Sequence, residues 1–260
     1  MKRCLLPVVA WLAIAGTLSA EIKSKPIAYQ DGDLQLEGYY AWDDAVSGKR
    51  PGIIIVHEWW GLNDYARHRA DQLARLGYAA FAVDMYGKGK LTEHPTEARE
   101  WAAQVRKNVD AWQQRALAGL NVLKQQEQCD TTRIAAMGYC FGGSTALQMA
   151  YTGADLKGVV TFHGALPIPD ESQAKAIKAR ILVCHGSADR FIPQDVIEKF
   201  QHMLDQAGAD WTMVYYAGAR HSFTDPDADK HNVDGMKYQK AADERSWKEM
   251  QEFYKEIFAK

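Results

Sequence analysis

Hydrophobic residues along this 260-residue chain gather in short runs that are apolar almost throughout, rather than alternating with polar residues. Such runs are typical of strands that are covered on both faces, as in a mostly parallel sheet. One segment, 35–43, alternates instead, which predicts an antiparallel edge strand. The continuous runs predict strands at 51–58, 78–85, 133–140, 157–164, 180–187 and 210–217.

Segments with helical periodicity separate these predicted strands. The longest of them is expected to break near Asn108. Regular alternation of strand and helix predicts an α/β fold, with a doubly wound, mostly parallel sheet flanked by helices. No internal repeat or low-complexity linker divides the chain, so we expect a single domain over residues 21–260. The predicted helices are 63–76, 95–126, 143–151, 193–207 and 235–258.

The first twenty residues have the three-part pattern of a secretory signal peptide. Lys2 and Arg3 precede an apolar run that ends near Gly16, and small residues follow up to Ala20. This run is shorter than the ~20 residues that a membrane-spanning helix requires. We therefore expect cleavage after Ala20 and an exported mature protein, periplasmic or secreted, that is not held in a membrane.

Charge is nearly balanced, with 31 Lys and Arg against 33 Asp and Glu, and neither sign forms a block. This pattern disfavours a nucleic acid or an anionic membrane surface as a partner. A small-molecule ligand or substrate is the expected partner instead.

The cysteines do not form a framework of disulfides or a zinc site. Cys4 lies in the predicted signal peptide, and an odd number of cysteines remains after cleavage, so an exported protein keeps at least one free thiol. No cysteine or histidine pair has the spacing of zinc ligands, and we expect neither a metal nor another cofactor. Three histidines near strand ends are expected to be ordinary core residues. The residues concerned are Cys129, Cys140, Cys184, His57, His163 and His185.

The segment GYCFG, residues 138–142, stands where a predicted strand turns into a predicted helix. It has the form G-x-nucleophile-x-G, in which a sharp turn strains the nucleophile and the glycines leave room for close packing. The start of the helix would favour a thiolate on Cys140 and an oxyanion beside it. A buried structural cysteine in a glycine-rich turn would have the same five residues, so the interpretation depends on other groups.

Two further residues complete a catalytic pattern. Asp189 follows the strand predicted at 180–187, and His221 follows the strand predicted at 210–217. Active residues of such sheets gather at the carboxyl ends of the strands. Nucleophile, acid and histidine follow one another along the chain in the order of the α/β-hydrolase triad. In that triad His221 takes the proton of the Cys140 thiol, and Asp189 orients the imidazole ring.

On these residues the chain resembles the dienelactone hydrolases, which are cysteine-dependent members of the α/β-hydrolase fold. The resemblance covers essentially the whole mature chain and implies hydrolysis of small esters, lactones or thioesters through an acyl-enzyme on Cys140. A catalytically silent relative that binds a small ligand or partner is the alternative, and a thiol redox protein would lack a resolving cysteine. The matching segments are HEWWGLND (57–64), GYAAFAVDMYG (77–87), GYCFGG (138–143), HGSADRFIP (185–193) and HSFTDP (221–226).

The resemblance also implies roles for residues around the nucleophile. Glu58 corresponds to a glutamate that holds the resting thiol by a hydrogen bond until substrate displaces it. The backbone amides of Trp59 and Phe141 would form the oxyanion hole. Beside this hole, Trp59 and Trp60 are expected to shape the pocket for the acyl or alcohol group, with only one of them touching substrate. The alternative is that the paired tryptophans serve packing alone.

One position departs from the family pattern. Members of the family bind a substrate carboxylate through an arginine four residues after the catalytic histidine, where this chain has Asp225. A second family arginine corresponds to Arg99, with Lys88 as another candidate for binding an anion. If Asp225 faces the pocket, neutral esters should be preferred to esters that bear a carboxylate. The alternative is that Asp225 only caps the turn at Pro226.

Overall fold

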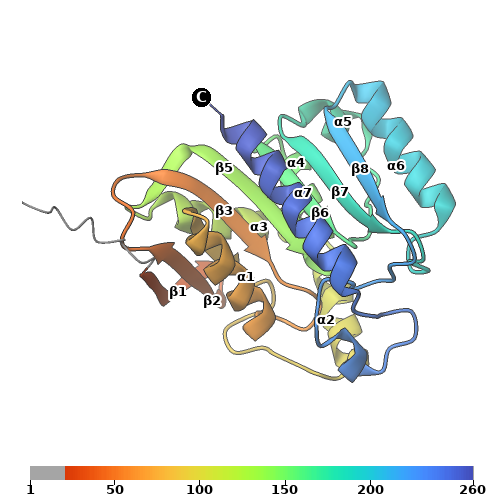
Figure 1. Ribbon diagram of the computed structural model, residues 1–260, viewed down its shortest axis with the longest axis horizontal. Coiled ribbons are helices and arrows are strands. Elements are labelled where there is room, and N and C mark those ends of the chain that lie inside the picture. Colours follow the sequence, from red (N-terminus) through yellow and green to blue (C-terminus); the bar gives the residue numbers. More distant parts are fainter. Residues whose placement is uncertain (1–20, 260) are drawn as a thin grey trace, which may run out of the picture.

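The structure is a computed structural model that describes residues 21–259. Residues 1–20, where the sequence predicts a signal peptide, lie outside the described range. A single twisted sheet runs through the molecule, with helices packed on both of its faces (Figure 1). The sequence prediction of a mostly parallel α/β fold is confirmed.

Eight strands form the sheet in the order β1-β2-β4-β3-β5-β6-β7-β8. The pairs β1–β2 and β2–β4 are antiparallel and all other neighbours are parallel. Every predicted strand is present, but β1 was missed because this edge strand contains no fully buried residue and therefore no apolar run. The strands are β1 (Ile22–Asp31), β2 (Leu34–Asp43), β3 (Arg50–Val56), β4 (Ala79–Val83), β5 (Cys129–Tyr139), β6 (Gly158–Phe162), β7 (Arg180–Gly186) and β8 (Trp211–Tyr216).

The helices lie close to their predicted places. The expected break occurs at Asn108, whose side chain accepts a hydrogen bond from the Ala111 N–H and caps the second of two helices. The last helix begins at Lys240 rather than 235, and a 3-10 turn, η1 (Ala228–His231), precedes it. The α-helices are α1 (Asp64–Arg75), α2 (Pro95–Arg106), α3 (Val109–Lys124), α4 (Phe141–Tyr151), α5 (Glu171–Ala176), α6 (Gln194–Ala207) and α7 (Lys240–Phe258).

The central strands are apolar throughout because each contributes to two cores. Successive side chains of a strand point to opposite faces of the sheet. In β3, Ile53 and Ile55 enter the core under α1 and α7, whereas Ile54 and Val56 enter the core under α3, α4 and α6. The two cores hold the parallel strands in place, so that their carboxyl ends, with the loops that follow, lie together at one edge.

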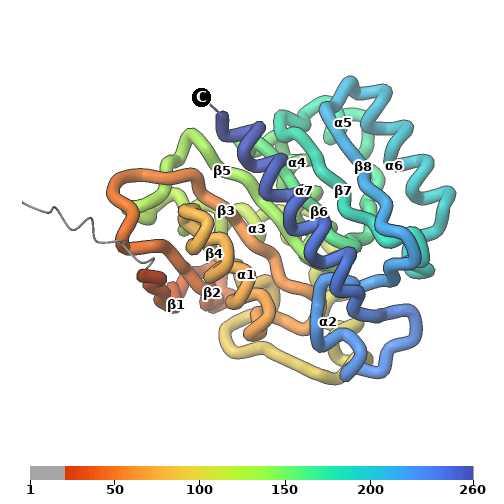
Figure 2. Tube along the Cα trace, viewed as in Figure 1, coloured from red at the N-terminus to blue at the C-terminus, as the bar shows by residue number. Residues whose placement is uncertain are grey.

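The loop after β8 and helix α2 come together beyond this edge, although they are far apart in the sequence (Figures 1 and 2). Ala98 of α2 and Met236 of the loop pack in one small cluster with Trp60. This cluster lies beyond the edge of the sheet at which the candidate residues gather. Within residues 21–259, no helix has the length and apolar character needed to cross a membrane.

Candidate active site

Cys140 occupies the sharp turn between β5 and α4. Its backbone has φ 52° and ψ −114°, a conformation with positive φ that is unfavourable for a residue other than glycine. The Cys140 N–H donates to the carbonyl of Phe162 at 3.0 Å, which ties the turn to the neighbouring strand β6. The surrounding strands therefore hold the strained turn that a nucleophile elbow requires.

The glycines of GYCFG are required by close backbone contacts. A Cβ atom added to Gly138 would lie 2.0 Å from the Gly142 carbonyl oxygen, and one added to Gly142 would lie 2.1 Å from the carbonyl oxygen of Val56. Both distances are far below contact distance, so no side chain fits at either position. The start of α4 can thereby approach β3 closely enough to place Cys140 beside the loop that carries Glu58.

His221 and Asp189 form a buried pair next to Cys140. The Nδ1 atom of His221 lies 2.8 Å from Oδ2 of Asp189, and Oδ1 of Asp189 accepts the N–H of Phe191 at 2.9 Å. Burial opposes the imidazolium, but the charge of Cys140 and the hydrogen bond with Asp189 outweigh it and raise the pKa of His221 well above its ordinary value. The structure thus brings together the three residues of the predicted triad.

The pKa of Cys140 moves in the opposite direction. Burial favours the neutral thiol, but the positive charge of His221 and hydrogen bonding to its ring outweigh burial and lower the pKa of Cys140. Arg106 and the backbone N–H of Phe141 add to this effect. Each of the two groups thus stabilises the charged form of the other.

Glu58 is almost fully buried behind the nucleophile. Its Oε2 atom accepts a hydrogen bond from the Ser222 hydroxyl at 3.3 Å, and Oε1 lies 3.6 Å from Nε2 of His163. Burial and the nearby charge of Cys140 raise the pKa of Glu58 well above its ordinary value, which favours the neutral carboxyl. In the described structure Glu58 is bonded to Ser222, and the Cys140 sulfur is stabilised by His221, rather than the two being joined as the resemblance implies.

His163 belongs to the same polar cluster, a place that the sequence did not indicate. Its Nε2 atom lies 2.7 Å from the Thr224 hydroxyl, which in turn is 2.7 Å from the hydroxyl of Tyr65. Its ring packs edge-on against His221, with 5.3 Å between centroids. Burial lowers the pKa of His163 well below its ordinary value, so the ring is neutral. Its position directly after β6 was the only signal, and a core histidine has the same signal.

A cavity of about 280 Å³ lies over Cys140 and is called here the catalytic cavity. Its ionisable lining residues are Cys140, His221, Arg99 and Arg106, and none of the described lining residues is a carboxylate. The guanidinium of Arg106 lies 5.3 Å from the ring centroid of Phe141. Arg99 was a sequence candidate, whereas Arg106 was missed because only the packing of α2 over the site brings it there.

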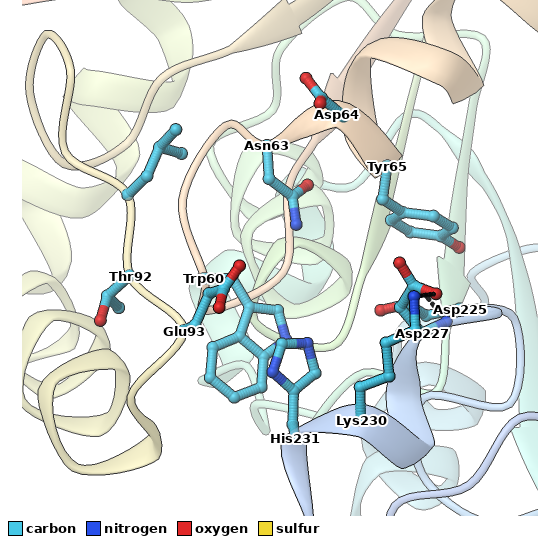
Figure 3. Close-up of a pocket in the computed structure, with 11 residues that line it drawn as sticks. Trp60, Asn63, Asp64, Tyr65, Thr92, Glu93, Asp225, Asp227, Lys230 and His231 are labelled. Carbon is cyan, nitrogen blue, oxygen red and sulfur yellow. Dashed lines mark hydrogen bonds and ion pairs between the residues drawn. The ribbon is translucent and has the colours of Figure 1, made fainter.

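Trp60 and Asp225 lie elsewhere, in a second cavity of about 560 Å³ that is called here the acidic cavity (Figure 3). The indole of Trp60 is buried and stacks on His231 with 3.9 Å between ring centroids. The buried carboxylate of Asp225 accepts the N–H of Asp227 at 2.9 Å, as expected of a residue that caps a turn. The other acidic groups that line this cavity are Asp64, Glu93 and Asp227.

The expected preference for neutral esters depended on Asp225 facing the substrate. Asp225 lines the acidic cavity and not the catalytic cavity, so the structure gives no support to that preference. Lys88 also lies outside that cavity, where its Nζ pairs with a carboxylate oxygen of Glu37 at 2.8 Å. Of the groups expected near the oxyanion, Trp59 lines the catalytic cavity and Phe141 is the first residue of α4. Among residues 21–259, no group of three or more histidine, cysteine or acidic residues is arranged to hold a metal ion.

Comparison with known proteins identifies the family. The sequence matches the model described as "Dienelactone hydrolase family" over residues 36–258. The chain belongs to the dienelactone hydrolase family. As members of this family act on esters, the protein is a hydrolase of the carboxylic ester type.

Individual relatives agree with this assignment to the dienelactone hydrolase family. The solved structure titled "m3DLH" is 39% identical with a TM-score of 0.89, over 92% of this chain and 99% of the other. A dienelactone hydrolase-like promiscuous phosphotriesterase, P91, from metagenomic libraries is 36% identical with a TM-score of 0.90, over 93% and 100% of the two chains. A Methylorubrum extorquens protein named "Putative carboxymethylenebutenolidase" is 27% identical, over 96% of this chain and 86% of its own.

Proposed function

We propose that this protein is an exported cysteine hydrolase that cleaves small esters, lactones or thioesters through an acyl-enzyme on Cys140. The observation that carries the proposal is the thiol at the strained elbow, next to an imidazole whose Nδ1 is held by Asp189 at 2.8 Å. A catalytically silent binding protein would not need a thiol, an imidazole and a carboxylate placed next to one another. No contact in the described structure favours that alternative. The proposal of export rests on the sequence pattern of residues 1–20 alone.

Acylation begins with the Cys140 thiolate. Its Sγ atom attacks the ester carbonyl carbon, and the electron pair of the C=O bond moves to the oxygen. The backbone N–H groups of Trp59 and Phe141 are proposed to hold this oxyanion, and such a donor contributes about 3–4 kcal/mol to transition-state stabilisation. When the tetrahedral intermediate collapses, the bond to the leaving oxygen breaks and His221 gives that oxygen its proton.

Deacylation reverses these roles. The now neutral His221 takes a proton from a water molecule, and the resulting hydroxide attacks the thioester carbonyl. The bond between carbon and Sγ breaks, the acid leaves, and Cys140 is again a thiolate beside an imidazolium ion. The raised pKa of Glu58 favours its neutral form, which would place no negative charge near the developing oxyanion.

The charge of the catalytic cavity favours an anionic substrate. Arg99 and Arg106 line this cavity and no described carboxylate does. Two opposite unit charges 4 Å apart near a protein surface attract by roughly 4 kcal/mol before screening, and exposed pairs retain about 1 kcal/mol or less. We therefore propose that an ester or lactone with a free carboxylate is preferred to the matched neutral compound.

Replacement of the nucleophile tests the proposed reaction. Cys140→Ala should lower the hydrolysis of aryl esters by at least ~10³-fold, because both half-reactions pass through its sulfur. The matched controls are Cys129→Ala and Cys184→Ala, which remove thiols that are buried away from the catalytic cavity. Hydrolysis by the Cys140→Ala protein at a rate near that of the parent would refute the cysteine mechanism.

A further inference from the structure

A shallow groove of about 310 Å³ lies next to the catalytic cavity, along the start of α6. It is called here the α6 groove. Four residues, Arg106, Ala165, Phe191 and Ile192, line both the groove and the catalytic cavity. The two spaces therefore adjoin each other, and the groove is about as large as the cavity that holds the nucleophile.

The chemistry of the α6 groove differs from that of the catalytic cavity. Away from the shared residues it is lined by Leu166, Pro167, Pro193 and Val196, together with Trp112. Ser144 also lines the groove, and its hydroxyl donates to the Ala165 carbonyl at 2.9 Å. Among the described residues that line the groove, Arg106 is the only ionisable one, and it lies where the groove meets the catalytic cavity. The rest of the groove offers an apolar surface and no charge.

Apolar side chains are also exposed at the mouth of the groove. Phe191 is 47% exposed, and Ile168, next to the lining residue Pro167, is 43% exposed. Phe191 packs edge-on against the ring of His221, with 5.0 Å between centroids. Exposed apolar groups that adjoin a reactive centre are typical of a surface that a ligand covers.

We propose that the α6 groove binds an apolar alkyl or aryl substituent of the ester substrate and so determines the size of substrate that this enzyme accepts. This inference rests on the proposed function, because the reacting carbonyl must lie at Cys140 for the substituent to reach the groove. The observation that supports the inference is that four residues line both the groove and the catalytic cavity. A small lactone would leave the groove empty, whereas a medium-length aliphatic or aromatic ester would fill it.

Two substrate series distinguish the acyl from the alcohol side of the ester. The first lengthens the acid in p-nitrophenyl acetate, butyrate, hexanoate and octanoate, and the second lengthens the alcohol in methyl to octyl esters of one acid. In the series that enters the groove, kcat/KM should rise by up to ~4-fold per methylene, the limit for burying a CH₂ group. A flat or falling kcat/KM in both series would overturn the proposal.

A charge placed in the groove should abolish this chain-length preference. Val196 is half-buried in the first turn of α6, where an acid is compatible with the helix dipole, so Val196→Asp should fold. In this variant the ratio of kcat/KM for octanoate to that for acetate should fall by at least tenfold. The matched control is Val46→Asp, at an exposed valine outside the groove, which should keep the parental ratio.

A binding measurement separates failure of the groove from failure of the proposed reaction. Calorimetry on Cys140→Ala should show octanoate binding at least tenfold more tightly than acetate, and the added Val196→Asp change should remove the difference. Equal affinities for the two anions would overturn the groove, whatever the activity of the parent. Tighter binding of octanoate by a protein that hydrolyses no ester would support the groove and refute the proposed function instead.

Discussion

The catalytic cavity and the acidic cavity adjoin the same pair of tryptophans, but their charges are opposite. Trp59 lines the catalytic cavity with two arginines, whereas Trp60 lines the acidic cavity with Asp225 and three other acids. The two indoles touch edge-on at 4.9 Å between centroids. The acidic cavity is the larger, about 560 against about 280 Å³, but only the smaller contains a nucleophile. Cavity size is therefore a poor guide to chemistry here.

Residues that are close together in one loop thus line different cavities, as His221 and Asp225 do. The sequence places Asp225 four residues after His221, but the turn that it caps directs it to the acidic cavity. Its influence on the reaction is indirect, since its charge contributes to the raised pKa of Glu58. Substrate charge should accordingly depend on the arginines of α2 rather than on Asp225. Substitutions in the catalytic cavity, each compared with a substitution in the acidic cavity, test this difference.

The largest effect is expected from His221→Ala. Loss of the base should lower ester hydrolysis by about 10²–10⁴-fold. The pH midpoint for alkylation of Cys140 by iodoacetamide should also rise, because burial, which raises the thiol pKa, would no longer be outweighed by the imidazolium. His231→Ala, in the acidic cavity, should leave this midpoint near that of the parent. An unchanged midpoint in His221→Ala would contradict the proposed ion pair.

A smaller and more selective effect is expected from Arg106→Ala. For an ester that bears a carboxylate, kcat/KM should fall about tenfold more than for the matched neutral ester, which corresponds to ~1.4 kcal/mol at low ionic strength. Lys230→Ala is the control, because this lysine lines the acidic cavity. If the two substrates lose activity equally in Arg106→Ala, the arginine acts only on the thiol and does not bind substrate.

The smallest effect is expected from Asp225→Asn. Removal of this charge should change the ratio of kcat/KM for anionic and neutral esters by less than about threefold, since the carboxylate caps a turn outside the catalytic cavity. The same pair of substrates measures it at low ionic strength. A tenfold shift towards the anionic ester would mean that Asp225 does face the substrate and that the two cavities are not independent.

The sequence predicted the central part of the fold because local patterns determine it. The apolar runs of β3 to β7 fill cores on both faces, and the close backbone contacts at Gly138 and Gly142 leave no room for a side chain. Where the local signal was weak, the prediction failed. The edge strand β1 has no buried residue, and the six residues of α5 are too few to show helical periodicity.

The residues of the candidate site likewise fall into those that local sequence patterns predict and those that they do not. Cys140, Asp189 and His221 each follow a strand, and parallel strands bring such positions to one edge of the sheet. Arg106 and the acidic cavity depend on how α2 and the loop after β8 pack across that edge, which no spacing along the chain encodes. Trp60 illustrates the limit, because one residue of displacement from Trp59 moves its side chain from one cavity to the other.

The buried carboxyl of Glu58 has a consequence for heat resistance. Because burial raises its pKa above the value in the unfolded chain, its contribution favours folding most below that ordinary value, and the benefit is lost as pH rises towards the folded pKa. Between these two pKa values only the unfolded chain is ionised, so the folded protein bears a cost that grows by about 1.4 kcal/mol for each pH unit above the ordinary pKa. Selection of variants for thermal survival alone should consequently favour glutamine or an apolar residue at this position. Selection for turnover would have to retain the acid, so the active site itself limits how stable this enzyme can become.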